Sequence, residues 1–221
     1  MIKKISSNFV EWCAQVVGSD DFDILDTETT GLRKSDQILE LAIVAASGTI
    51  LYDKLLQPSC AISEGAFAAH KISEAMLEDR PCFKEEWPEI EAAIAERSII
   101  TYNAEFDFRM LRQSAIAHNV ILPIYDYFCA MREYARFWRA PSREGTWLGS
   151  ERLSSGSAPH QKLEVACAQQ GIEFVQEHRA ISDVLATLQI IRRIASGNAP
   201  TYQTRKREWY DWNDVEGSLK E

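Results

Sequence analysis

The sequence has no long hydrophobic run, and this absence limits where the protein can work. No stretch of the 221 residues approaches the roughly 18 to 20 consecutive apolar residues that a membrane helix needs. The first residues, 1–7, include two lysines, but no apolar segment of signal-peptide length follows them. We therefore expect a cytoplasmic protein with no membrane partner.

Cysteine is scarce and scattered along the chain. The five cysteines are an odd number, and no two of them form a CxxC pair. This spacing argues against a disulfide framework and against a cysteine-ligated zinc site, and it is typical of reduced thiols. We expect the cysteines to act as small buried hydrophobic residues.

Positive charge is also in short supply. The 33 acidic residues against 24 lysines and arginines give a net charge of -9. This balance argues against a protein that coats nucleic acid by bulk electrostatic attraction. It is compatible with an enzyme that holds a few phosphates through metal ions, because the carboxylates that bind the metal add to the negative count. The length and the hydrophobic content of 46% indicate one globular domain with a sizeable core.

The order of the apolar segments predicts an α/β fold. The predicted strands cover residues 22–28, 37–46, 49–57, 98–102 and 124–129. The predicted helices cover residues 84–97, 104–118, 161–170 and 179–196, and a short helix is expected among the loops of 58–81. Turn signals between the first three strands favour an antiparallel meander, whereas the short apolar fourth strand is typical of a buried parallel strand. The pattern predicts a mixed five-stranded sheet flanked by helices.

Two acidic residues lie close together at the end of the first predicted strand. Asp26 and Glu28 are two residues apart, so their side chains leave the same face of the strand, while Asp23 should point to the other face. Gly31 follows in a turn where a backbone can approach a ligand closely. A carboxylate pair on one face is costly unless a cation neutralises it. The alternative is that both acids are solvated at the strand end.

A third acid comes where the fourth strand leads into a helix. Asp107 shares a side of that helix with Met110, Leu111 and Ser114, so it should point toward the sheet. Taken alone, an aspartate in a first turn is as well explained by its favourable interaction with the helix dipole.

A fourth acid and a histidine lie at the start of the last helix. Its predicted buried stripe consists of Ile181, Val184, Leu185, Leu188 and Ile191. Asp183 lies next to this stripe, and His178 precedes the helix, where a loop can direct its imidazole toward the same place. A single histidine at such a position is also compatible with a structural role, which is what we expect by default of His70, His118 and His160.

Together these segments resemble the motifs of the DEDDh (DnaQ-like) 3'–5' exonucleases, a family that includes bacterial proofreading subunits, RNase T and oligoribonuclease. The first motif is an intact DxETTGL at residues 26–32. The second is Asn-Ala-Glu-Phe-Asp at 103–107, and the third is His178 followed five residues later by Asp183. The resemblance extends over about residues 20–195, and it implies the ribonuclease H-like fold.

The resemblance implies a role for each acid. Asp26, Glu28, Asp107 and Asp183 would bind two Mg²⁺ ions, which Mn²⁺ could replace, with Asp26 bridging them. His178 would be the general base that takes a proton from the attacking water, since its ordinary pKa of about 6.5 suits that task. Each turnover would release a nucleoside 5'-monophosphate from a 3' end.

The resemblance also implies a set of substrate contacts. The residues concerned are Thr29, Gly31, Leu32, His70, Asn103 and Phe106. Leu32 would pack against the terminal base, and His70 would lie near it. The chain departs from the family at Lys71, where relatives often have glycine, and at Tyr102, where histidine is common.

The family domain is expected over 21–197, preceded by an N-terminal helix or extension over 1–20 and followed by a polar, aromatic tail over 198–221. Single-stranded DNA is the first expectation for the substrate, and RNA is the alternative. A third possibility is a non-catalytic binding or docking subunit, with the tail contacting a polymerase or another protein. Arginines and aromatics alternate over 132–152, which fits either a single-strand surface or an amphipathic helix whose aromatics are buried.

Overall fold

The computed structural model describes residues 8–94, 97–138, 147–148, 151–152 and 160–201. Five strands form one mixed sheet in the order β3-β2-β1-β4-β5, which confirms the predicted fold class. These strands are β1 (Phe22–Thr29), β2 (Ile38–Ala45), β3 (Ile50–Leu55), β4 (Ser98–Thr101) and β5 (Tyr127–Cys129). The first three are antiparallel neighbours, whereas β1–β4 and β4–β5 are parallel pairs. Strands β6 (Trp147–Leu148) and β7 (Glu151–Arg152) form a separate pair.

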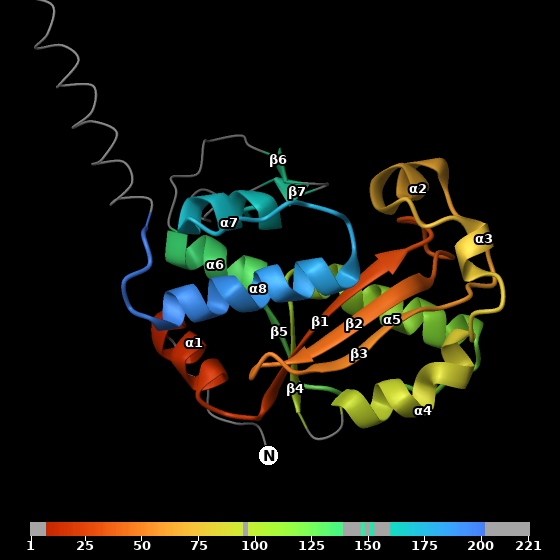
Figure 1. Cartoon of the computed structure of the whole chain (residues 1–221), viewed down its shortest axis with the longest axis horizontal. Coiled ribbons are helices and arrows are strands. Elements are labelled where there is room, and N and C mark those ends of the chain that lie inside the picture. Colours follow the sequence, from red (N-terminus) through yellow and green to blue (C-terminus); the bar gives the residue numbers. More distant parts are fainter. Residues whose placement is uncertain (1–7, 95–96, 139–146, 149–150, 153–159, 202–221) are drawn as a thin grey trace, which may run out of the picture.

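Helices cover both faces of the sheet (Figure 1). They are α1 (Phe9–Val17), α2 (Glu64–His70), α3 (Glu74–Leu77), α4 (Phe83–Ile94), α5 (Ala104–Ala117), α6 (Ala130–Trp138), α7 (Leu163–Gln170) and α8 (Ala180–Ala195). Because side chains alternate along a strand, neighbouring residues of β1 enter different cores. Ile24 packs with α1, α6, α7 and α8, while Leu25 packs with α4 and α5.

Helix α1 is part of the main core. Its residues Trp12, Cys13 and Val16 are buried in the same cluster as the apolar side of α8. The aromatic ring of Trp12 also meets Phe22 at the start of β1. Helix α1 therefore supports the strand that carries the first two acids. Within the described residues, no helix is both long and apolar enough to span a bilayer.

The structure departs from the sequence prediction at β5 and in α8, and it adds helix α6, which was not among the predicted helices. Strand β5 begins at Tyr127 rather than 124, because it pairs only with the three residues Ile99 to Thr101 of the short strand β4. Ile124 is fully exposed. Leu185 was expected in the buried stripe of the last helix but is 37% exposed, since the buried side of α8 runs instead through Val184, Ala186–Leu188 and Ile190–Ile191.

The arginine- and aromatic-rich segment is described only in part. In α6, Tyr134 and Trp138 are buried, whereas Arg132 and Arg136 are exposed. This part therefore fits the amphipathic-helix interpretation. Arg139 and Arg143 lie outside the described residues, as do the side chains of Trp147 and Arg152 and the whole tail from residue 202.

The described cysteines behave as expected. All five are free, and Cys13, Cys129 and Cys167 are buried. Burial raises the pKa of the Cys167 thiol to about 12. The three buried thiols act as packing groups, whereas Cys60 and Cys82 are only partly buried.

Candidate active site

The candidate site lies where the C-terminal end of β1 meets the N-terminal end of α8, beside α2 (Figure 1). Asp26 and Glu28 leave the same face of β1, and both are partly buried. Asp183 lies in the first turn of α8. One carboxylate oxygen from each of these three acids lies within 4.8 Å of the others. The structure thus brings together three of the four acids predicted as metal ligands.

Asp107 is close to this group but is held differently. It lies in the first turn of α5 and is only 2% exposed. Its Oδ1 accepts a hydrogen bond of 2.8 Å from the hydroxyl of Thr27, a residue that points away from the Asp26 face of β1. The charge of Asp107 still reaches Asp26, whose pKa it helps to raise. Asp107 is therefore a neighbour of the three-acid group and not one of its members.

Burial and mutual repulsion dominate the electrostatics of the acids. Burial is the first cause of the raised pKa of Asp26, followed by the charges of Asp107, Asp183 and Glu28. Burial and then the charges of Asp183, Glu40 and Asp107 raise the pKa of Glu28 to about 8. Burial and then the charges of Glu164 and Glu40 raise the pKa of Asp183 to about 6. The cluster is therefore costly to ionise unless a cation joins it.

The donor set fits a divalent metal ion. Hard cations such as Mg²⁺ and Mn²⁺ take oxygen ligands, and three carboxylates converge here. Asp183 Oδ1 is buried and has no hydrogen-bond partner among the described residues. A buried carboxylate oxygen without a partner is unfavourable, and a bound cation would satisfy it.

His178 lies in the loop immediately before α8, on the same side as Asp183. It is partly buried and has a backbone φ of 49°, a left-handed conformation that is uncommon for a residue with a side chain. Such conformations cost free energy and are concentrated at functional sites.

The turn after β1 is held by hydrogen bonds from the loops around it. Thr29 Oγ1 donates to the carbonyl of Gly31 at 2.9 Å. The backbone N–H of Ser63 donates to the carbonyl of Thr30 at 2.8 Å. Gly31 is needed for its size, since a Cβ there would lie 2.5 Å from Asp36 Oδ2. Beyond this turn Leu32 is 76% exposed, so its side chain is free to meet a substrate.

The His70 side chain is buried against the turn and does not face solvent. Its ring is 3% exposed, and its Nδ1 accepts a hydrogen bond of 2.9 Å from the N–H of Ile72. Nε2 therefore carries the proton and donates to the Thr29 carbonyl at 3.3 Å. Burial lowers the pKa of His70, which keeps it neutral. The next residue, Lys71, has a φ of 59°, which explains why glycine suits this position in relatives.

The remaining predicted residues line the α5 side. Asn103 precedes α5 without a side-chain capping bond, and Phe106 is partly buried against the α4–α5 core, with the Arg109 guanidinium 5.3 Å from its ring centre. Tyr102, which stands where relatives often have histidine, donates its hydroxyl to the Gln161 carbonyl at 2.8 Å. Tyr102 therefore has a structural role, linking β4 to the segment before α7.

The sequence analysis missed one acid at the site. Glu40 of β2 lies directly opposite Glu28 in the β1–β2 pair and is 1% exposed. Its carboxylate is paired with Arg179, the residue after His178. A single acid within the apolar run 38–46 was the signal that could have identified it.

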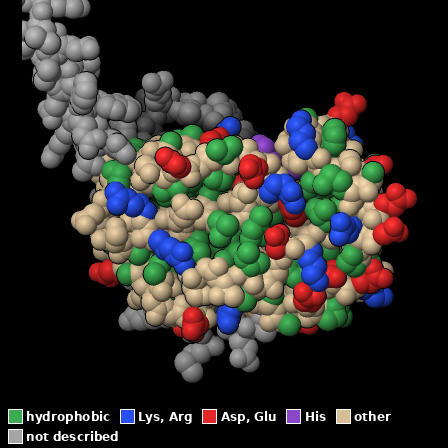
Figure 2. All heavy atoms as spheres, in the orientation of Figure 1, with side chains coloured by type: hydrophobic (Ala, Val, Ile, Leu, Met, Phe, Trp, Pro, Cys, Tyr) green, Lys and Arg blue, Asp and Glu red, His purple; other side chains and the backbone are tan. Residues whose placement is uncertain are grey.

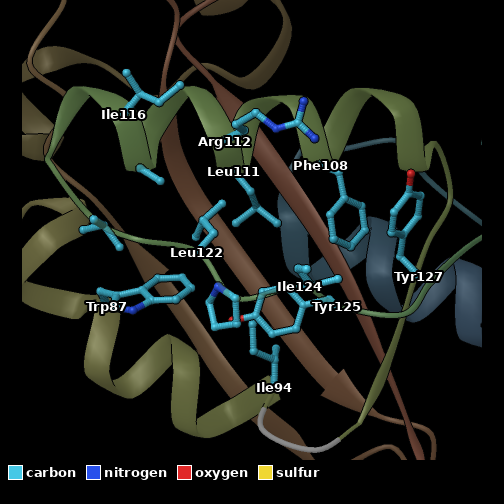
Figure 3. A pocket seen from close by; sticks show the side chains of 13 residues that line it. Trp87, Ile94, Phe108, Leu111, Arg112, Ile116, Leu122, Ile124, Tyr125 and Tyr127 are labelled. Carbon is cyan, nitrogen blue, oxygen red and sulfur yellow. The ribbon is translucent and has the colours of Figure 1, made fainter. Parts of the chain in front are cut away.

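A pocket of about 390 Å³ lies elsewhere, between α4, α5 and the segment before β5 (Figure 3). Its walls are mainly apolar and aromatic, with Trp87, Leu111 and Leu122 pointing into it. None of the site acids lines it. The face in Figure 2 carries interspersed acidic and basic side chains over its described part, with no continuous basic area. The convergence of the three acids, and not this pocket, therefore identifies the site.

Comparison with known proteins decides the family. The model of the RNase T family, described as "Exonuclease", matches residues 24–191. The chain belongs to this exonuclease family. The "uncharacterized exonuclease CP81" of Escherichia phage 186 is 31% identical over 187 residues, which are 81% of this chain and 91% of the phage protein. The chain is a 3'–5' exonuclease, and its family depends on divalent metal ions, which the three converging carboxylates fit.

Two solved structures share the fold of this exonuclease. "Exonuclease X in complex with 5' overhanging duplex DNA" is 23% identical with a TM-score of 0.57, over 83% of this chain and 96% of that one. The nuclease domain of "3'hExo, a DEDDh family member, bound to rAMP" is 14% identical with a TM-score of 0.63, over 81% and 94%. Both confirm the ribonuclease H-like arrangement of the mixed sheet and its flanking helices.

Proposed function

We propose that this exonuclease removes nucleotides from the 3' end of single-stranded DNA, with Mg²⁺ held by Asp26, Glu28 and Asp183, and releases nucleoside 5'-monophosphates. The observation that carries the proposal is the convergence of these three carboxylates within 4.8 Å. A phosphodiester carries negative charge and would be repelled by such a cluster, so the acids favour this substrate only through bound cations.

Each side chain then has a defined task. Two cations at the acids would stabilise the attacking and the leaving oxygens of an in-line displacement. Asp26, central in the cluster, would bridge them, and Asp107 would hold the second one from the α5 side. His178 would take the proton from the attacking water, because its loop can swing the imidazole over the Asp183 side.

The substrate strand would enter over the turn that follows β1. The backbone of 29–32 would contact the terminal nucleotide, and the exposed Leu32 side chain would pack on its base. His70, whose two ring nitrogens are already used, would shape this turn without touching the nucleotide. Asn103 and Phe106 would border the strand from the α5 side.

DNA is our first proposal for the polymer because the relative with the more complete coverage, Exonuclease X, was solved with DNA. One observation favours a second candidate, an exoribonuclease. The 3'hExo nuclease domain, which has the higher TM-score, was solved with rAMP. Both polymers would be cut by the same chemistry.

A gel assay on matched 5'-labelled single-stranded DNA and RNA tests the proposal. Products that shorten from the 3' end with Mg²⁺, and that disappear with EDTA and in the Asp26→Ala/Asp183→Ala double variant, would support it. Faster shortening of RNA than of DNA would favour the exoribonuclease. If neither strand is shortened with Mg²⁺ or Mn²⁺, the proposal is wrong.

A further inference from the structure

Glu40 is a buried acid that the proposed reaction does not use. It projects from β2 beside Glu28, on the face of the sheet that carries the metal-binding acids. Its Oε1 and Oε2 accept hydrogen bonds of 2.9 and 3.1 Å from Nε of Arg179, and Nη2 of the same guanidinium also donates to Oε1. Its Oε2 accepts a further bond of 3.0 Å from the backbone N–H of Ala180.

These bonds tie the sheet to the first turn of α8. Arg179 is the residue immediately before α8, and Ala180 is its first residue. Glu40 therefore satisfies an N–H of the helix that has no partner inside the helix, as a capping side chain would. Because Glu40 comes from a different element, it also fixes where that helix end lies relative to β1 and β2.

The same hydrogen bonds distinguish Glu40 from the acids that would bind metal. Both of its oxygens are already used, whereas Asp183 Oδ1 has no hydrogen-bond partner among the described residues. Burial raises the pKa of Glu28, and the nearby charge of Arg179 partly opposes this shift. Arg179 is nevertheless paired with Glu40, so it does not neutralise the three-acid group.

We propose that the Glu40–Arg179 pair is a positioning device that sets the distance from Asp183 and His178 on the α8 side to Asp26 and Glu28 on β1. The inference rests on the proposed function, because it concerns the same metal site. His178 precedes Arg179 directly, and Asp183 follows it by one helical turn. A shift of the pair would therefore move a metal ligand and the proposed base together, away from two acids on a rigid strand. Outer groups that orient metal ligands typically contribute a factor of roughly 10 to 100 in metal affinity or activity.

The chain offers a matched control pair. Asp23, at the other end of β1, is buried like Glu40, and its Oδ1 is 3.0 Å from Nη1 of Arg97. The two arginine side chains are similarly exposed, at 34% for Arg97 and 40% for Arg179. The pairs differ in place, since only the Glu40 pair lies beside the three-acid group.

The experiment compares Glu40→Gln with Asp23→Asn in the full-length protein. Mn²⁺ affinity is measured by electron paramagnetic resonance, kcat and KM on a labelled oligonucleotide, and stability by urea unfolding. Glu40→Gln should weaken Mn²⁺ binding and lower kcat by roughly 10- to 100-fold, with little change in KM. Asp23→Asn should leave Mn²⁺ affinity and kcat at the wild-type level.

Arg179→Lys provides a second variant that keeps the charge beside Glu40 if Glu40→Gln does not fold. The lysine ammonium cannot make the two-pronged contact of the guanidinium. Arg179→Lys should therefore be more stable than Glu40→Gln but bind Mn²⁺ more weakly than the wild type. Wild-type Mn²⁺ affinity in both Glu40→Gln and Arg179→Lys would overturn the positioning role. So would an equal loss in Asp23→Asn. Absence of Mn²⁺ binding in the wild-type protein would instead overturn the proposed function.

Discussion

The buried acids at the two ends of strand β1 have neighbours of opposite charge. Near its start, Asp23 is fully buried beside Arg97, and at its far end Asp26 and Glu28 are surrounded by further acids. Burial raises the pKa of Asp23 to about 6 even though Arg97 opposes the shift, and that of Glu28 to about 8. One oxygen of Asp23 also lacks a hydrogen-bond partner, so hydrogen bonding alone does not separate the two ends.

The difference lies in the source of the positive charge. At the start of β1 the chain supplies its own cation, and the acid is part of the framework. At the far end Arg179 is already engaged by Glu40, and the other acids only add repulsion. A cluster of this kind is stable as a charged group only with cations from solution, which is why it marks the functional end of the strand.

The largest expected effect comes from removing the central acid. Asp26→Asn should lower exonuclease activity by more than ~100-fold, beyond what the loss of an outer group typically costs. It should also stabilise the metal-free protein, because it removes a charge that burial and neighbouring acids disfavour. Activity on a labelled oligonucleotide and urea unfolding in EDTA check both results. A variant that is inactive and also less stable than the wild type would contradict the repulsion argument.

The pH dependence of stability provides the second comparison. A carboxyl with a raised pKa binds its proton more tightly in the folded state, so the free energy of unfolding falls as pH rises from about 4.5 to 8, the window of Glu28. Urea unfolding in EDTA across this range should show the decrease, and saturating Mn²⁺ should reverse it by binding the ionised acids. A metal-free protein that gains stability over the same range would refute this account.

A smaller effect is expected at the turn after the far end of β1. Gly31→Ala would place a Cβ 2.5 Å from Asp36 Oδ2, so it should lower the free energy of unfolding by about 1 to 3 kcal/mol. Urea unfolding measures the loss, and Gly65→Ala, where a Cβ would meet nothing within 4 Å, is the control. Equal stability of the two variants would show that the turn can move aside.

The smallest effect is expected at the start of β1. Asp23→Asn should change stability by no more than about 1 kcal/mol at neutral pH, since the lost ion pair and the relieved burial of charge oppose each other. As the pH rises from 3.8 to about 6, the wild type should lose stability relative to this variant, because Asp23 binds its proton more tightly in the folded state. Parallel unfolding curves over this window would show that Asp23 titrates normally.

Much of the fold and of the candidate site could be predicted from the sequence because it depends on local patterns. The apolar runs at 22–29 and 38–45 predict two strands, and the two-residue spacing of Asp26 and Glu28 places both side chains on one face of the first. The helical stripe around Asp183 predicts where its side chain points. These patterns predict where the three acids point, whereas their assignment as metal ligands came from the resemblance to the DEDDh exonucleases.

The parts that could not be predicted depend on contacts between distant segments. The Glu40–Arg179 pair joins residues 139 positions apart, and the Thr27–Asp107 hydrogen bond joins residues 80 apart. No local pattern contains either contact. The neutral, doubly bonded state of His70 likewise depends on Thr29, which is 41 residues away.

Mn²⁺ binding measured by electron paramagnetic resonance tests the central claim most directly. The account predicts that the wild-type protein and Asp23→Asn bind Mn²⁺ with equal affinity and that Asp26→Asn does not bind it. Equal binding by all three proteins, or none by the wild type, would contradict the claim that the far end of β1 is a metal site.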